Sequence, residues 1–243
     1  MPEIILASAG SLAPALSEFA DRFASEAGHA VRLRSGPAGL LTQEILKGMP
    51  ADVFVSASPQ GPAELWRKGL YGQPRTIGRN RMVLVVHPDV ETSRNSARAL
   101  LADPRWRIGM STPGADPSGD YTAAFLDRLI ATDPFRWRGL RDRCVSLYGA
   151  ALPDGPAPPR SPAVEALCSR KADMLIAYAT TAGRIAEALP GAKILPLPPE
   201  IALPTEICAC VRSGAPDPAR RLFEALQRPE CATILRRHGF IAA

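Results

Sequence analysis

Three short segments of small and hydroxyl-bearing residues suit the binding of an anion. They are residues 8–11 (SAGS), 36–39 (GPAG) and 116–119 (DPSG), and each follows an expected strand and precedes an expected helix. The first turn of a helix has unpaired N–H groups and a partial positive charge, so it attracts negative groups. Glycine, alanine and serine let a ligand approach that backbone closely. A single junction of this kind is ordinary turn and cap chemistry, so the repetition carries the argument.

Alternating strands and helices position these junctions. Apolar runs and alternation predict strands at residues 4–6, 29–35 and 52–56. Apolar spacing of three and four predicts helices at residues 12–27, 40–46 and 63–68. Ser11 stands at the expected N-cap of the first of these helices. This order predicts a parallel sheet with helices on both faces, in which the junctions line up along the carboxyl ends of the strands.

The later part of the chain continues the same alternation. Strands are expected at residues 81–87, 107–111, 173–178 and 206–211, and helices at residues 121–131, 164–167, 218–226 and 231–237. Two proline-rich stretches, residues 152–162 and 195–204, are expected to be loops.

The composition is that of an ordinary globular protein. Hydrophobic residues make up 46% of the 243 residues and charged residues 22%, and the length fits one large domain or two lobes. The net charge of +5 is spread along the chain, and we find no Lys/Arg block with interleaved aromatic residues. We therefore expect no nucleic-acid partner, while a small anion would still be attracted. No apolar run is long enough to span a membrane.

Cysteines and the first residues leave the cellular compartment open. The start MPEIILASAG has no basic n-region and no apolar h-region, so we expect either a cytosolic protein or a mature exported domain. Five cysteines are an odd number, so at least one thiol cannot pair internally. Cys208 and Cys210 face one side of an expected strand with no partner at zinc spacing. Buried free thiols and no structural metal are therefore expected.

Enzyme motifs are missing from the sequence. It contains no G-x-S-x-G elbow, no H-E-x-x-H pair, no Walker loop and no G-x-G-x-x-G segment. The three histidines, His29, His87 and His238, have no carboxylate at a recognisable spacing, and surface or capping roles are expected for them. We therefore expect a protein that is not an enzyme and has no cofactor.

Four segments resemble the molybdate-binding proteins of bacterial ABC importers. They are ASAGSL (7–12), GPAGLLTQEILKGMPADVFVSAS (36–58), DMLIAYATTA (173–182) and ECATILRRHGF (230–240). A fifth, ADPSGDY (115–121), is similar to the tungstate/molybdate branch of the same superfamily. The resemblance covers essentially the whole chain, and residues 36–58 are its most specific part.

This resemblance implies a two-lobed α/β fold of the type II periplasmic-binding-protein class, each lobe a mostly parallel sheet flanked by helices. Lobe one would hold residues 1–80 plus 200–243 and lobe two residues 81–199, with the ligand cleft between them and capture by hinge closure. The implied function is that of a periplasmic, monomeric solute-binding protein. It would deliver a small oxyanion, molybdate or tungstate, to the membrane permease of an ABC transporter.

The resemblance also assigns ligand contacts in lobe one. The family's first oxyanion-binding serine falls on Ser11, which is retained. Its second serine falls on Ala38, so one hydroxyl is lost and the backbone N–H groups of Ala38 and Gly39 remain. Losing one such donor costs about 0.5–1.5 kcal/mol of binding energy.

In lobe two the implied contacts are Ser118, Tyr178 and, near a gap, Arg160. Asp116 matches a carboxylate that contacts the metal in the tungstate branch, but the second carboxylate of that branch falls on Ala177. Six-coordinate metal binding is therefore not expected, and Asp116 remains a weak candidate for contact with the oxyanion's metal.

Each of these residues also has a purely structural interpretation. Asp116 is equally suited to cap the following helix, Tyr178 to pack in the core, and Arg160 to be a solvated loop residue. A guanidinium in the site would instead favour a carboxylate, phosphonate or other anion over molybdate. Three functional alternatives stay open: a binding protein for another small anion or carboxylate, a cytosolic anion-sensing domain, and an enzyme of related two-lobed fold.

Overall fold

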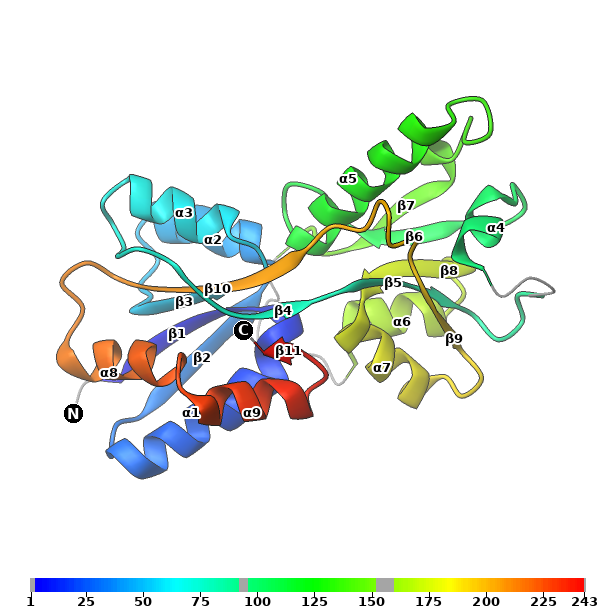
Figure 1. Ribbon diagram of the computed structural model, residues 1–243. Helices are drawn as coiled ribbons and strands as arrows, with labels where there is room; N and C mark the ends of the chain where they lie inside the picture. Colours follow the sequence, from blue (N-terminus) through cyan, green and yellow to red (C-terminus); the bar gives the residue numbers. More distant parts are fainter. Residues whose placement is uncertain (1–2, 92–95, 152–159, 243) are drawn as a thin grey trace. The chain divides into compact units, whose positions relative to one another are not determined.

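The computed structural model describes residues 3–91, 96–151 and 160–242, which fold into two α/β units (Figure 1). The first unit is Met1–Asn80 with Thr205–Ala243, and the second is Arg81–Pro204. Residues 200–204 therefore belong to the second unit and not, as expected, to lobe one. The expected loop at residues 152–162 lies largely outside the described residues.

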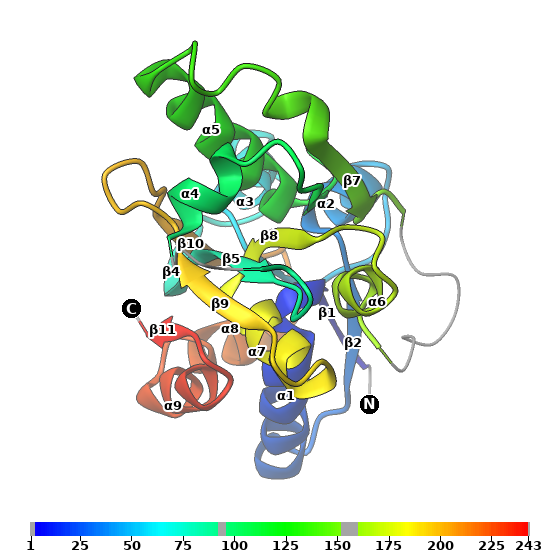
Figure 2. The ribbon, with the colours of Figure 1, turned by 90° about the vertical axis from the view of Figure 1, so that its right-hand side faces the viewer.

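The first unit is a six-stranded sheet in the order β11-β4-β10-β3-β1-β2. Its strands are β1 Ile4–Ala9, β2 Val31–Gly36, β3 Val53–Ser56, β4 Arg75–Asn80, β10 Thr205–Val211 and β11 Ile241–Ala242. Its helices are α1 Ala13–Ala27, α2 Ala38–Leu46, α3 Gln60–Arg67, α8 Asp217–Ala225 and α9 Pro229–Arg237. In Figures 1 and 2, α2 and α3 cover one face of this sheet, and α1, α8 and α9 cover the other.

The second unit is a five-stranded sheet in the order β7-β6-β8-β5-β9. Its strands are β5 Met82–Val86, β6 Ile108–Ser111, β7 Cys144–Tyr148, β8 Met174–Tyr178 and β9 Lys193–Pro196. Its helices are α4 Ala97–Ala102, α5 Pro117–Thr132, α6 Pro162–Cys168 and α7 Ala179–Ala188. Figures 1 and 2 show α4 and α5 on one face of this sheet and α6 and α7 on the other.

Apolar strands buried on both faces hold the second unit together. Every residue of β5 and of β8 is buried, as is typical of strands covered by helices on both sides. On one face Val85 and Leu175 pack with Leu167 of α6 and Ile185 of α7. Each such side chain contributes about 1.5–3 kcal/mol when it is fully buried.

The two-unit α/β class predicted from the sequence is confirmed, but the expectation of mostly parallel sheets is wrong. β1 runs parallel to β2 and β3, whereas β10 is antiparallel to both β3 and β4. In the second unit β5 is antiparallel to β8 and β9. Strands β4, β5 and β10 lie where the chain passes between the units, so no strand–helix–strand crossover fixes their direction.

Residues 134–143 form a basic stretch with interleaved aromatic residues, contrary to the expectation that the chain has none. It holds Arg136, Arg141 and Arg143 among its arginines, interleaved with Phe135 and Trp137. Much of the stretch serves the fold: Arg143 donates to three backbone carbonyls, Arg141 pairs with an aspartate of α5, and the Arg136 guanidinium lies over the buried Trp137 ring. The absence of a nucleic-acid partner stays a prediction.

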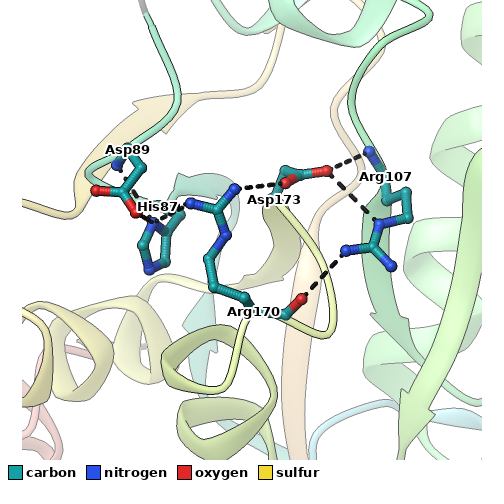
Figure 3. A network of polar contacts seen from close by, with 5 residues as sticks. All are labelled: His87, Asp89, Arg107, Arg170 and Asp173. Atoms are coloured by element: carbon teal, nitrogen blue, oxygen red, sulfur yellow. Dashed lines mark hydrogen bonds and ion pairs between the residues drawn. The ribbon is translucent and has the colours of Figure 1, made fainter.

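A polar network ties three strand ends of the second unit together (Figure 3). Arg170 Nη1 donates to Asp89 Oδ2 at 2.8 Å and contacts His87 Nδ1 at 3.3 Å, and its Nη2 donates to Asp173 Oδ1 at 3.1 Å. Asp173 Oδ2 accepts from the Arg107 backbone N–H at 2.8 Å. Arg170 adopts a left-handed φ of 54°, which costs a non-glycine residue about 1–2 kcal/mol. These bonds offset that cost.

We expect this network to make the second unit sensitive to acid through His87. Burial and the neighbouring Arg170 guanidinium lower the pKa of His87 in the folded protein. The unfolded chain, with a histidine pKa of about 6.5, therefore binds more protons as the pH falls below that value. The free energy of unfolding should decline from about pH 6.5 down to the folded pKa.

Urea unfolding of the wild type and of His87→Gln between pH 8 and pH 5 measures this effect. The variant should lose less stability than the wild type on acidification, and its value at pH 8 serves as the reference. Parallel declines of the two proteins would show that His87 is not responsible.

Candidate functional site

Three strand ends of the first unit meet at one edge of its sheet. β1 lies between β2 and β3 and runs parallel to both, with Ala9 opposite Gly36 and Ser8 opposite Val55. The chain therefore leaves the sheet three times, side by side, and a helical segment begins soon after each exit. Their unpaired first-turn N–H groups are donors for an anion.

Ser11 does not cap a helix, contrary to the expectation from the sequence. Residues Gly10–Leu12 form a 3-10 turn, and α1 begins only at Ala13, with a proline in its first turn. Proline favours this position because its fixed φ suits the first helical turn and it lacks the N–H that would be unpaired there. The Ser11 side chain is half-buried, and its hydroxyl makes no hydrogen bond to the described residues. This leaves the Ser11 hydroxyl available to a ligand.

Ala38 and Gly39 form the first turn of α2. Ala38 is 1% exposed, and Pro37 at the N-cap position offers no side-chain hydrogen bond. No side chain therefore competes for the first N–H groups of α2. The structure thus places small residues and an uncapped turn at the two junctions predicted in the first unit, while their contact with a ligand stays a prediction.

Ser56 and Ser58 belong to the same edge and were missed by the sequence analysis. Ser56 is the last residue of β3, and Ser58 lies between β3 and α3. The two residues are 1% and 6% exposed, and Ser58 N–H donates to Ser56 Oγ at 3.2 Å. The rule used for the other junctions, a strand followed by small residues and a helix, identifies them when it is applied to residues 56–59.

The second unit repeats this arrangement around β6. β7 and β8 flank β6 and run parallel to it, so that Ser111, Tyr148 and Tyr178 end the three strands on one edge. Tyr178 is 3% exposed, and its ring meets that of Tyr121 edge-on, with the centroids 6.4 Å apart. Ser111 is fully buried and was not singled out from the sequence.

Asp116 caps α5, as one interpretation of the sequence had it. Its Oδ1 accepts from the Ser118 backbone N–H and its Oδ2 from Ser111 Oγ, both at 3.0 Å. Burial raises the pKa of the Asp116 carboxyl, while these two hydrogen bonds act in the opposite direction. Ser118 is 4% exposed. The second-unit junction therefore carries its own acidic cap, unlike the junctions of the first unit.

Tyr148 supplies a donor that the sequence did not reveal. Its Oη is buried and makes no hydrogen bond to the described residues, although Ser118 and Asp116 lie near it. Burial raises the pKa of both Tyr148 and Tyr178, so both phenols stay protonated at neutral pH. A buried hydroxyl without a partner is uncommon and marks a place where a ligand oxygen could bind.

Arg160 is exposed and directly precedes Ser161, whose hydroxyl caps α6. Within the described part of the chain it forms no ion pair or hydrogen bond. Most of the proline-rich stretch before it, residues 152–159, lies outside the described residues. Its proposed contact with an anion rests on the family resemblance alone.

The described residues contain neither a cluster of metal ligands nor a membrane-spanning helix. Among the described residues, no three His, Cys, Asp or Glu side chains gather as metal ligands would, and no helix is long and apolar enough to cross a membrane. The five cysteines are free. Burial raises the pKa of Cys231 to about 12 and that of Cys144 to about 11, so these two remain thiols at neutral pH.

A family of known proteins matches nearly the whole chain. The model of a family described as "Bacterial extracellular solute-binding protein" matches residues 4–241. An uncharacterized protein of Pasteurella multocida is 32% identical over 155 residues, a match that spans 62% of this chain and 63% of that protein. The molybdate-binding protein ModA of Rhodobacter capsulatus is 21% identical over 98% of this chain and 88% of its own.

Solved structures of solute-binding proteins share the fold of this chain. The periplasmic molybdate-binding protein of Azotobacter vinelandii is similar over 99% of both chains, with a TM-score of 0.77 and 22% identity. At that identity the likeness concerns the fold and leaves the ligand open.

Gly149 tests whether the second-unit cluster is as closely packed as its hydrogen bonds indicate. It has a φ of +81°, and a Cβ there would lie 2.3 Å from Ser111 Oγ and 3.1 Å from Asp116 Cβ. Gly114 has a similar φ of +78° but nothing within 4 Å of its Cβ position. Gly114→Ala should therefore cost only the left-handed backbone strain, about 1–2 kcal/mol.

We expect Gly149→Ala to cost clearly more than Gly114→Ala in denaturant unfolding, because it also displaces Ser111 and Asp116. The difference between the two variants isolates the packing contribution. Equal losses would show that the space around Ser111 and Asp116 is less restricted than the distances imply.

Proposed function

The chain belongs to the family of bacterial extracellular solute-binding proteins, and from that membership we propose that it captures a small oxyanion. We further propose that it delivers the anion to the membrane permease of an ABC importer, in the periplasm or at the outer cell surface. Capture by hinge closure, without chemical change of the solute, is part of this proposal.

The observation that carries the proposal is the uncapped edge of the first unit. The Ser11 hydroxyl has no partner among the described residues, and no side chain caps the first turn of α2 at Ala38 and Gly39. Neutral N–H and O–H donors of this kind can satisfy a dehydrated anion by hydrogen bonds alone. The positive end of the helix dipole adds to that attraction.

Molybdate or tungstate is a narrower proposal. It is supported by the relatives whose names state molybdate binding and by retention of Ser11. Ala38 weakens the case for molybdate or tungstate, because the hydroxyl that the family resemblance implies is absent there. Another small anion or a carboxylate, and an anion-sensing role in the cytosol, are the alternatives that the same donors would serve.

We expect a small oxyanion to stabilise the protein and Ser11→Ala to weaken this effect. A ligand that binds only the folded state adds about 2.7 kcal/mol at 100 times its dissociation constant. Loss of one hydroxyl donor costs about 0.5–1.5 kcal/mol, which is roughly a twofold to tenfold loss of affinity. Thermal shifts with molybdate, tungstate, sulfate, phosphate and small carboxylates measure both.

Ser25→Ala is the matched control, because Ser25 is an exposed serine near the other end of α1. It should leave every shift unchanged. If no anion in the series raises the melting temperature of the wild type, the proposed ligand class is wrong.

We expect Arg160 to distinguish anions if its guanidinium reaches the ligand. Arg160→Lys should then weaken phosphate or carboxylate binding well beyond the effect of Arg138→Lys, an exposed arginine of the same unit, because lysine cannot form the bidentate contact. Isothermal titration gives the two affinities. Should Arg160→Ala stay within twofold of the wild type, Arg160 is a solvated surface residue and plain molybdate-type recognition is favoured.

A further inference from the structure

Asp116 places a carboxyl group at the junction of the second unit where the resemblance implies contact with an anion. As a residue Asp116 is half-buried, and burial of its carboxyl group raises the pKa of that group. One oxygen accepts from Ser118 N–H and the other from Ser111 Oγ. Two directed hydrogen bonds fix its position, and it cannot simply swing away from a ligand that binds beside it.

An ionised carboxylate and a fully ionised oxyanion are poor neighbours. Both can only accept hydrogen bonds, and both are negative. Asp116 has no ion pair with a lysine or arginine in the part of the chain that the structure describes. A single proton between the two groups changes the repulsion into a charge-assisted O–H···O hydrogen bond.

The polar groups around Asp116 are one serine, two phenols and a second carboxylate. The β6 neighbour is Ser111, and the β7 and β8 neighbours are the phenols of Tyr148 and Tyr178. On α5 the neighbour is Asp120, a second carboxylate, whose Oδ1 accepts from Gly114 N–H at 2.7 Å. Burial raises the pKa of both phenols, so they stay protonated at neutral pH, and it raises the pKa of the Asp116 carboxyl, which favours its protonated form.

Tyr148 is an independent indication that a ligand oxygen belongs here. Its buried hydroxyl lies beside Asp116 and Ser118 without a hydrogen bond of good geometry to any described residue. A buried donor of this kind destabilises the folded protein while it is unsatisfied. An oxyanion oxygen would satisfy it and would then lie close to the Asp116 carboxyl.

We infer that Asp116 links oxyanion binding to the uptake of one proton. The site therefore prefers an anion that brings a proton, such as hydrogen phosphate or a phosphonate monoanion, to a fully ionised one such as sulfate or molybdate. The proton lies between a carboxyl oxygen and a ligand oxygen, and no other bond forms or breaks. This inference rests on the proposed function and narrows its ligand class.

Isothermal titration with sulfate, molybdate and inorganic phosphate at pH 5.5, 7.0 and 8.5 tests the inference. In the wild type, sulfate affinity should fall by up to about tenfold per pH unit where Asp116 ionises, since one proton is linked to binding. Repeating the titration in buffers of different ionisation enthalpy should show close to one proton taken up per sulfate.

Asp116→Asn keeps an efficient N-cap and offers a permanent N–H donor. It should make sulfate binding independent of pH and lower the preference for phosphate over sulfate. Asp120→Asn, on the same helical turn, is the matched control and should retain the pH dependence of the wild type.

Two results would overturn the inference while leaving the proposed function intact. One is wild-type sulfate binding without pH dependence or proton uptake, a measurement that does not depend on any variant folding. The other is an unchanged pH dependence in folded Asp116→Asn. If none of the three anions binds the wild type at any of these pH values, the proposed function is wrong.

Discussion

Parallel pairing about a central strand is the constraint on which the candidate site depends. β1 has parallel neighbours on both sides in the first unit, and β6 has them in the second. Because parallel strands all end at the same edge, each unit gathers three chain exits there. Helices that start next to those exits point their unpaired N–H groups toward that edge. The hydrogen-bonding pattern of the sheets thus decides where an anion can be recognised.

The two units use this edge with opposite chemistry. In the first, no side chain caps the starts of α1 and α2, so backbone N–H groups and the Ser11 hydroxyl remain as neutral donors. In the second, the start of α5 is already capped by the Asp116 carboxyl, which is in turn held by Ser111. A site made only of donors would bind any small anion, whereas a site that includes an acceptor distinguishes anions by their protonation state.

Much of this arrangement could be predicted from the sequence, and the exceptions have physical reasons. Apolar periodicity located the strands and the junctions, because burial on one or both faces dictates those patterns. Strand direction at β10 could not be predicted, because it depends on where the chain returns to the first unit. Ser11 was wrongly expected to be a cap because Pro14 fixes a later start for α1. Tyr148 was missed, since periodicity does not tell whether a hydroxyl finds a partner.

Hydrogen–deuterium exchange of the wild-type protein with and without a saturating oxyanion tests the central claim most directly. Whereas Ser118 N–H of the second unit already donates to Asp116, anion binding at the strand ends should slow exchange of the first-turn amides in residues 10–12 and 38–40 of the first unit. These amides have no intrahelical acceptor, so they exchange readily until a ligand oxygen accepts from them. Slower exchange at these amides is the predicted result. Binding that protects other segments and leaves these amides unchanged would contradict the account.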